Sequence, residues 1–374
     1  MVLRPGSVQT VFPELETLSP VIQLERDLGA DWRSLKTAAE ETQTVLFELD
    51  QLVSGKASAD SSVVVTGSLG RKEYTKGSDL DWILLVDGAG DARDQQTFLE
   101  IDRAIDAAER FKKPGREGTF GKLAFSQPMI HHIGGEEDSN SNTTRRILLL
   151  LEAVSIGESR AFERVRKGIL LRYLQEDRGL FQRDHSNRIR WVPLFLLNDL
   201  ARYWRTMTVD FAYKQFDRGN KGYALRSVKL GISRKLMFAS GLLACFWCDQ
   251  EISGIPAPQP RVQNLIASLN EFLSWTPLER LALFFSKHLA DAREGDFLRQ
   301  TALALFGAYD GFIEMLNTPE VRDHLEKLPP EQVHTDPIFK NARAIRGQFR
   351  QAVHDMFLDN RSPLYTLTID KGVF

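Results

Sequence analysis

Apolar residues recur every three or four positions along most of the chain, which is the periodicity of amphipathic helices. This pattern predicts helices from about residue 13 to residue 52, at residues 93–111, and almost continuously after residue 142. The second half opens with the stretch TTRRILLLLEAVSIGE, which we expect to be helical throughout.

Three segments of the first half show strand patterns instead. Residues 63–66 (VVVT) and 79–86 (DLDWILLV) are short and rich in apolar or β-branched side chains, as buried strands are. Residues 120–133 predict a third strand that is interrupted by Pro128. The expected fold class is α+β: a short mixed sheet with N-terminal helices and an all-helical C-terminal domain. We expect one domain over residues 1–160 and the helical one over residues 161–374.

Composition narrows the class of protein. The chain has 374 residues with 48 Lys and Arg against 50 Asp and Glu, so a net charge of −2 gives no strong sign of a long nucleic-acid partner. The first residues lack the apolar core of a secretory signal, and the longest mostly apolar stretch, residues 236–248, is shorter than the ~20 residues of a membrane span. Cys245 and Cys248 lie in that stretch and are expected to be core thiols. We therefore expect a cytoplasmic protein with no membrane partner.

The two carboxylates of Asp79 and Asp81 form the first candidate site. They are two residues apart in a predicted strand, where alternate side chains point to the same face. Mg²⁺ prefers one or two carboxylates together with phosphate and water oxygens. The pair therefore predicts a site for Mg²⁺ or Mn²⁺.

The segment GSLGR, residues 67–71, is the second candidate. It stands where the first strand is expected to turn into a helix, so that free backbone N–H groups can face an anion. Gly67 allows a phosphate to approach the backbone, Ser68 adds a hydroxyl, and Arg71 can reach a further phosphate oxygen. A phosphate site only 12 residues before a metal site predicts a metal-bound nucleoside triphosphate, such as ATP.

Together these motifs resemble the DNA polymerase β-type nucleotidyltransferase superfamily. The resemblance covers residues 63–86, where G-S-x-G-R is followed by S-D-x-D and an apolar strand, and weaker similarity to the PII-uridylyltransferase-like branch continues to residue 166. Cyclic-oligonucleotide synthases share a similar size and layout. The resemblance implies a nucleotidyltransferase core in which Gly67 and Ser68 position the triphosphate and Asp79 and Asp81 bind the catalytic metals.

The same resemblance implies a third carboxylate on a later strand, which residues 120–133 do not contain. Acidic residues flank that segment, and two histidines lie near its end; these candidates are Glu117, Glu136, Glu137, Asp138, His131 and His132. Either one of them replaces the third acid, or the step that activates the acceptor is weakened or lost.

Two predicted helices of the second half gather cations on one face. Lys229 and Ser233 share a face with Arg226, and Asn198, Arg202 and Arg205 share another. Related enzymes grip the outgoing phosphates with a Lys and a Ser on such a helix, so the resemblance implies this role for Lys229 and Ser233. An ordinary solvated basic face is the alternative.

Three functions fit these observations. The first is transfer of a nucleoside monophosphate from a nucleoside triphosphate to a hydroxyl of a protein or small molecule, with release of pyrophosphate. The second is synthesis of a cyclic or linear oligonucleotide messenger. The third is a catalytically degenerate, nucleotide-binding regulatory protein, which the missing third acid suggests.

Overall fold

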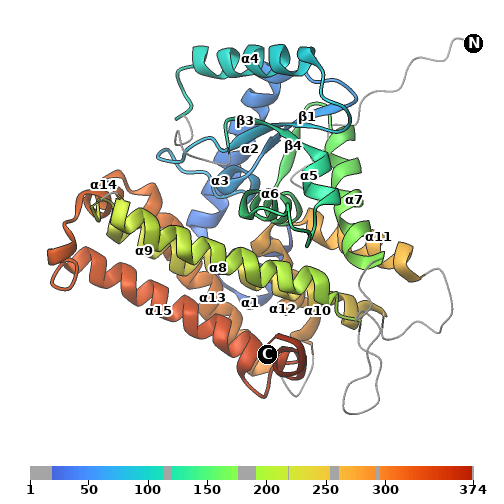
Figure 1. Cartoon of the computed structure of the whole chain (residues 1–374). Helices are drawn as coiled ribbons and strands as arrows, with labels where there is room; N and C mark the ends of the chain where they lie inside the picture. Colours follow the sequence, from blue (N-terminus) through green and yellow to red (C-terminus); the bar gives the residue numbers. More distant parts are fainter. Residues whose placement is uncertain are drawn as a thin grey trace, which may run out of the picture.

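The computed structural model of the chain describes residues 19–112, 120–175, 191–217, 219–252, 261–290 and 295–372. Over these residues it is a mixed α/β fold in which a small sheet is followed by a large helical part (Figure 1). The expected α+β class with an N-terminal helical pair is confirmed. The domain boundary at residue 160 stays a prediction.

The sheet has four strands in the order β3-β2-β1-β4. The strands are β1 (Ser61–Val65), β2 (Trp82–Val86), β3 (Lys122–Phe125) and β4 (Val154–Ile156). β1 pairs antiparallel with β2 and β4, with Val63 opposite Leu84 and Ile156, and β2 pairs parallel with β3. The sheet is therefore mixed, as expected.

The two faces of the sheet enter different cores because side chains alternate along each strand. Val64 and Ile83 point into the large core that continues through the helical part, whereas Val63 and Leu84 point into a smaller core. α2 (Arg33–Val53) and α4 (Ala92–Ala107) close the smaller core.

Helices cover the sheet and build the rest of the molecule. Those nearest the sheet are the single turn α3 (Gly67–Gly70), α5 (Ser126–His131), α6 (Asn140–Leu151) and α7 (Arg160–Gln175), whereas α1 (Pro20–Leu28) packs on the helical part. The helical part contains α8 (Leu194–Asp217), α9 (Tyr223–Lys229), the π-helical turn η1 (Leu230–Arg234), α10 (Lys235–Ile252), α11 (Arg261–Ser274), α12 (Pro277–His288), α13 (Gly295–Asn317), α14 (Pro319–Lys327), η2 (Pro330–Gln332), α15 (Pro337–Leu358), α16 (Tyr365–Leu367) and η3 (Thr368–Gly372). The N-terminal helices pack onto this part: Trp32 stacks on Phe306 of α13 with ring centroids 4.7 Å apart.

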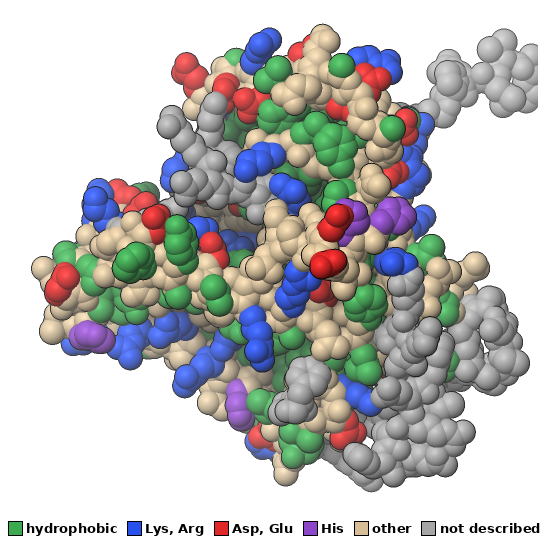
Figure 2. Space-filling model, in the orientation of Figure 1, with side chains coloured by type: hydrophobic (Ala, Val, Ile, Leu, Met, Phe, Trp, Pro, Cys, Tyr) green, Lys and Arg blue, Asp and Glu red, His purple; other side chains and the backbone are tan. Residues whose placement is uncertain are grey.

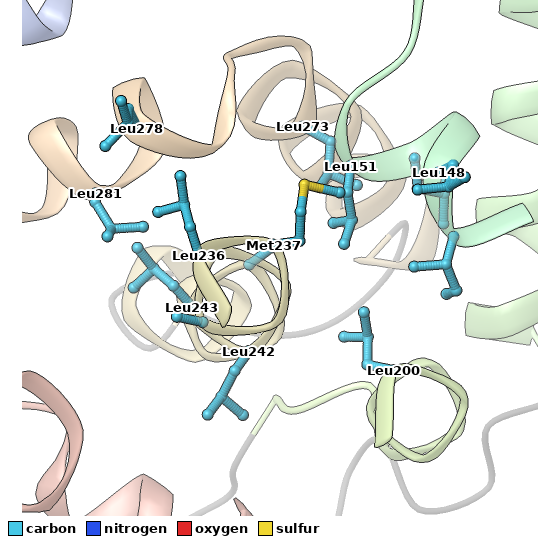
Figure 3. Packing of buried hydrophobic residues seen from close by; sticks show 14 of the residues in the cluster. Leu148, Leu151, Leu200, Leu236, Met237, Leu242, Leu243, Leu273, Leu278 and Leu281 are labelled. Carbon is cyan, nitrogen blue, oxygen red and sulfur yellow. The ribbon is translucent and has the colours of Figure 1, made fainter. Parts of the chain in front are cut away.

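α10 is the central helix of the large core. Leu236, Met237 and Leu243 are fully buried, and leucines of α6, α8, α11 and α12 surround them (Figure 3). The continuous helical stretch Tyr223–Asp249 is long and apolar enough to cross a membrane by length and composition, but 67% of its most apolar window is buried inside the protein. It therefore has the environment of a core helix. Cys245 and Cys248 are both buried on it, as expected, and burial raises the pKa of Cys248 to about 12.

Three predicted elements were wrong in their extent. The stretch expected to be one helix after residue 142 ends at Leu151 and then supplies strand β4, because Val154–Ile156 finds an open edge of β1 to pair with. The expected strand at residues 120–133 is only four residues long and gives way to α5, in which Pro128 is tolerated within the first turn. Asp79 and Asp81 precede β2 and do not lie within it.

Close packing joins α3 to the start of β4. A Cβ atom at Gly70 would lie 1.9 Å from the backbone oxygen of Glu152, so only glycine fits there. This contact fixes the turn after β1 against the residue that leads into β4.

We expect Gly70→Ala to lower the free energy of unfolding by at least ~3 kcal/mol, because the obstructing atom is backbone and cannot rotate away. The matched control is Gly307→Ala in α13, where an added Cβ meets nothing within 4 Å. That change should stabilise the protein by up to ~1 kcal/mol through helix propensity. Urea denaturation measures both variants, and equal stability of the two would contradict the proposed packing.

Candidate nucleotide site

Asp79 and Asp81 lie on the extended segment that leads into β2. The backbone N–H of Thr66 donates to the carbonyl of Asp81 at 2.9 Å, and that of Leu80 donates to the carbonyl of Lys112 at 2.9 Å. Leu80 is buried between the two aspartates, so backbone alternation gives both carboxylates the opposite, open side. The Asp79 side chain is 45% exposed, and its Oδ1 lies 3.1 Å from Nζ of Lys112.

Asp81 sits in a more enclosed and more negative environment than Asp79. Burial raises the pKa of Asp81 to about 6; Glu152 and Asp79 add to the shift, while Arg234 and Arg71 oppose it. A divalent cation beside these carboxylates would relieve the same repulsion. Two carboxylates with one exposed flank are a donor set that suits Mg²⁺ or Mn²⁺, whose other positions are filled by phosphate and water oxygens.

Gly67 borders Asp81 directly. Its φ angle is +68°, and a Cβ atom there would lie 2.7 Å from Oδ2 of Asp81. Glycine is therefore required twice, by the backbone conformation and by the close carboxylate. The motif residues Gly67 and Asp81 thus meet in space.

The predicted phosphate cradle differs from the observed turn in two respects. α3 is a single helical turn of four residues and not the start of a longer helix. The backbone N–H of Gly67 donates to Oε1 of Glu152 at 3.0 Å, so a carboxylate of the protein occupies the donor that was expected to face phosphate. Ser68 is half-buried at the rim of the turn.

Arg71 was expected to reach a phosphate oxygen, but two buried carboxylates hold it. Its Nη1 donates to Glu152 at 2.6 Å and its Nε donates to Glu73 at 2.8 Å. Tyr309 of α13 donates to the other oxygen of Glu73 at 2.8 Å. Burial would lower the pKa of Arg71, yet Glu73 and Glu152 outweigh it and raise that pKa well above its usual value. We call Arg71, Glu73, Glu152 and Tyr309 the ionic cluster.

Lys229 of α9 faces the Asp79–Asp81 segment from the helical part. Burial lowers the pKa of Lys229 to about 8, and the charges of Arg322 and Arg234 lower it further, while Asp79 opposes them. The charge of Asp79 thus acts on the predicted Lys, although residue 229 is 150 positions later in the chain.

Ser233, its predicted companion, is engaged within its own helix. Its hydroxyl donates to the carbonyl of Lys229 at 3.0 Å and is buried. Arg234, at the end of η1, acts on Asp81 through its charge and opposes the rise of the Asp81 pKa.

Arg322 of α14 is a further cation that the sequence did not single out. Its Nη1 donates to Thr75 at 3.2 Å and its Nη2 donates to the carbonyl of Gly77. A Cβ atom at Gly77 would lie 2.5 Å from the centre of the guanidinium group. Arg322 therefore holds the loop that precedes Asp79, and no local sequence signal links the two.

Most candidates for the third acid are engaged or distant. Glu117 lies outside the described residues. Asp138 is buried, and although burial opposes it, hydrogen bonds from Arg146, Gly134 and Arg202 lower its pKa. Glu136 and Glu137 are exposed, and His132 lies 3.5 Å from Glu137 at the end of α5 with His131 beside it. Across the described residues, no group of three or more His, Cys, Asp or Glu side chains could hold a metal ion.

A groove of about 780 Å³ runs along α8 and is separate from the aspartates. Its lining includes Asn140 and the predicted face of Asn198, Arg202 and Arg205. Arg202 donates to the carboxylate of Asp138 at 2.7 Å, which ties one side of the groove to the N-terminal end of α6. The predicted face therefore borders a groove, but neither Asp79 nor Asp81 lines that groove.

Comparison with known proteins supports the reading of the motif. Residues 28–113 match a family model described as "Putative nucleotidyltransferase DUF294". The matched segment contains Gly67, Asp79 and Asp81, so the resemblance to nucleotidyltransferases is confirmed and an enzyme of this general type is supported. The branch within the superfamily stays a prediction. No curated protein matches the chain.

We expect Arg71→Met to lower the free energy of unfolding by about 3–5 kcal/mol, because it leaves two buried carboxylates without their cation. Arg164→Met is the matched control: Arg164 pairs with Asp60 and Asp87, but its side chain is 46% exposed. Its loss should cost no more than ~1 kcal/mol. Urea denaturation distinguishes them. A stable Arg71→Met protein with lost triphosphate affinity would restore the phosphate-binding role to Arg71.

Proposed function

We propose that this chain is a metal-dependent nucleotidyltransferase that moves a nucleoside monophosphate from a nucleoside triphosphate to a hydroxyl of a protein or small molecule. The observation that carries the proposal is the convergence of three separate segments on one corner. Gly67 after β1 lies against Asp81 before β2, and the charge of Asp79 acts on Lys229 of α9, which supports a shared site. We also propose that the protein acts in the cytoplasm.

Each segment has a separate task in this reaction. Asp79 and Asp81 would hold Mg²⁺ or Mn²⁺, which when bound supplies charge neutralisation and Lewis acidity at the triphosphate. Lys229 and Arg234 face the same corner and offset the charge of the leaving pyrophosphate. Gly67 keeps the backbone clear of the bound phosphates, and Ser68 offers a hydroxyl at the rim.

The reaction forms a bond from the acceptor oxygen to the α-phosphorus and breaks the bond from that phosphorus to the bridging oxygen of the β-phosphate. Pyrophosphate leaves and the acceptor loses its hydroxyl proton. Catalysis of this kind is mainly alignment and charge stabilisation. The acceptor classes stay open, and a messenger oligonucleotide is the alternative product.

A nucleotide-binding protein without catalysis is the second candidate function. It is favoured by one observation: among the described residues no group of three or more acidic, His or Cys side chains could hold a metal ion, and Glu152, the carboxylate near Asp81, is bound by Arg71. Incubation with each labelled nucleoside triphosphate separates the possibilities. Labelled protein or small molecule supports the first proposal, labelled oligonucleotide supports the messenger synthase, and binding without pyrophosphate release supports the regulatory protein.

We expect Asp79→Asn/Asp81→Asn to reduce metal-dependent pyrophosphate release at least 10³-fold while the protein stays folded, because both charged ligands are lost. The control Asp27→Asn/Glu40→Gln makes the same charge change at exposed positions and should leave the rate unchanged. Pyrophosphate is measured with Mg²⁺ and with Mn²⁺. Undiminished release by the aspartate variant would refute the assignment of the site.

We also expect triphosphate binding to draw a proton onto Lys229. Its pKa is about 8 in the free protein, so at pH 9 the amine is mostly neutral, and a neighbouring triphosphate favours the charged form. Calorimetry at pH 9 in buffers of different ionisation enthalpy should show uptake of most of one proton. Lys229→Arg keeps the charge and should bind without that uptake. Equal proton uptake by both proteins would place the triphosphate away from Lys229.

A further inference from the structure

α15 carries a row of cations along one face. Lys340, Arg343, Arg346 and Arg350 follow one another at intervals of three or four residues, and residues 337–354 contain no Asp or Glu. Lys340, Arg343 and Arg350 are exposed, and Arg346 is half-buried. Figure 2 shows Lys and Arg side chains gathered over this helix.

The segment α9–η1 and the start of α10, along one side of α15, add a like charge and no opposite one. Arg346 packs directly against Gly231 of η1, where a Cβ atom would lie 2.3 Å from Cδ of the arginine. Arg346 also donates a hydrogen bond to Ser227 at 2.9 Å. Burial lowers the pKa of Lys235, and Arg350 and Arg346 lower it further. Within the described parts of the chain, none of the five cations forms an ion pair with a carboxylate. We call Lys235, Lys340, Arg343, Arg346 and Arg350 the basic row.

Exposed aromatic side chains lie on the neighbouring helix α8. Tyr213 is 63% exposed and Phe216 is 88% exposed, and Val209, 68% exposed, stands on the same side one turn earlier. Val209 and Tyr213 also line the 780 Å³ groove. Figure 2 shows hydrophobic side chains over α8 on the same face of the molecule as the basic row.

Internal aromatic contacts connect the two helices. Tyr223 at the start of α9 packs on Phe211 of α8, with centroids 6.3 Å apart, and on Phe339 of α15, with centroids 6.5 Å apart. The end of α8 that carries Tyr213 and Phe216 is therefore fixed close to the start of the basic row.

We propose that this face binds single-stranded nucleic acid, with the basic row on phosphates and Tyr213 and Phe216 stacked on bases. A cationic track beside exposed aromatic rings is the combination that such strands require. Arg supplies three of the five cations, and its planar guanidinium suits phosphate oxygens. An acidic protein would use the cations but gives no reason for the exposed rings. A membrane-surface helix carries cations and rings on opposite faces of one helix, whereas here they lie on separate helices. The proposal does not depend on the proposed transferase activity.

The test is fluorescence anisotropy of labelled 20-nucleotide oligo(U) and oligo(dT) with the full chain. We expect binding that weakens with salt, and Arg343→Ala/Arg350→Ala should lower the slope of log affinity against log salt by about 0.7 for each lost phosphate contact. The control Lys56→Ala/Arg103→Ala removes two exposed cations from the sheet-bearing part and should leave the slope unchanged.

The aromatic half of the proposal has its own matched pair. Tyr213→Ala should weaken binding at least about fivefold, the lower end for loss of one stacked base. Phe47→Ala removes a ring of equal, 63% exposure on α2 and should have no effect. No binding at low salt, binding unaffected by the basic-row and Tyr213 variants, or binding to phosphatidylserine vesicles without binding to either oligonucleotide would overturn the proposal.

Discussion

The ionic cluster is the constraint on which the candidate site depends. Arg71 links the turn after β1 to the residue before β4, and Glu73 extends the link to α13 through Tyr309. Removing any one member leaves a buried polar group without its partner, which is more costly than the pair itself is stabilising. The position of Gly67 beside Asp81 follows from this cluster, because Glu152 binds both Arg71 and the backbone N–H of Gly67.

The site therefore consists of two layers, one buried and structural and one that faces the proposed ligand. The lower layer, the ionic cluster, is closed to solvent, and its single guanidinium is shared by two buried carboxylates. The upper layer consists of Asp79, Asp81, Lys229 and Arg234, whose charges face one another across a corner that is open at Asp79. The pKa is about 6 for Asp81 and about 8 for Lys229 in the upper layer. Shifts of this kind are typical of residues in binding or catalytic sites.

The local motif could be predicted from the sequence, but the contacts that hold it in place could not. The strands β1 and β2, the glycine turn and the aspartate pair could be predicted because each depends on neighbouring residues, and Lys229 was found from helical spacing. Arg234 was missed because it lies outside the three- and four-residue spacing that singled out Lys229 and Ser233, and the role of Ser233 stays a prediction. Glu152 and Arg322 act through contacts with residues more than 80 positions away, which a local pattern cannot contain. The basic row could not be predicted from the net charge, because a total over the whole chain does not show where the charged residues lie.

The contacts that complete the site also set when it can form during synthesis. Three contacts of the motif use partners from the helical part. Glu73 accepts from Tyr309, and Lys72 pairs with Glu279. Arg322 donates to the loop before Asp79. After Val86, the end of the motif, a ribosome must still translate 193 residues to reach Glu279 and 236 to reach Arg322. Chains truncated before α13 hold every residue of the motif but lack the contacts that position it. The layout thus confines a finished nucleotide site to chains that have been translated through α14.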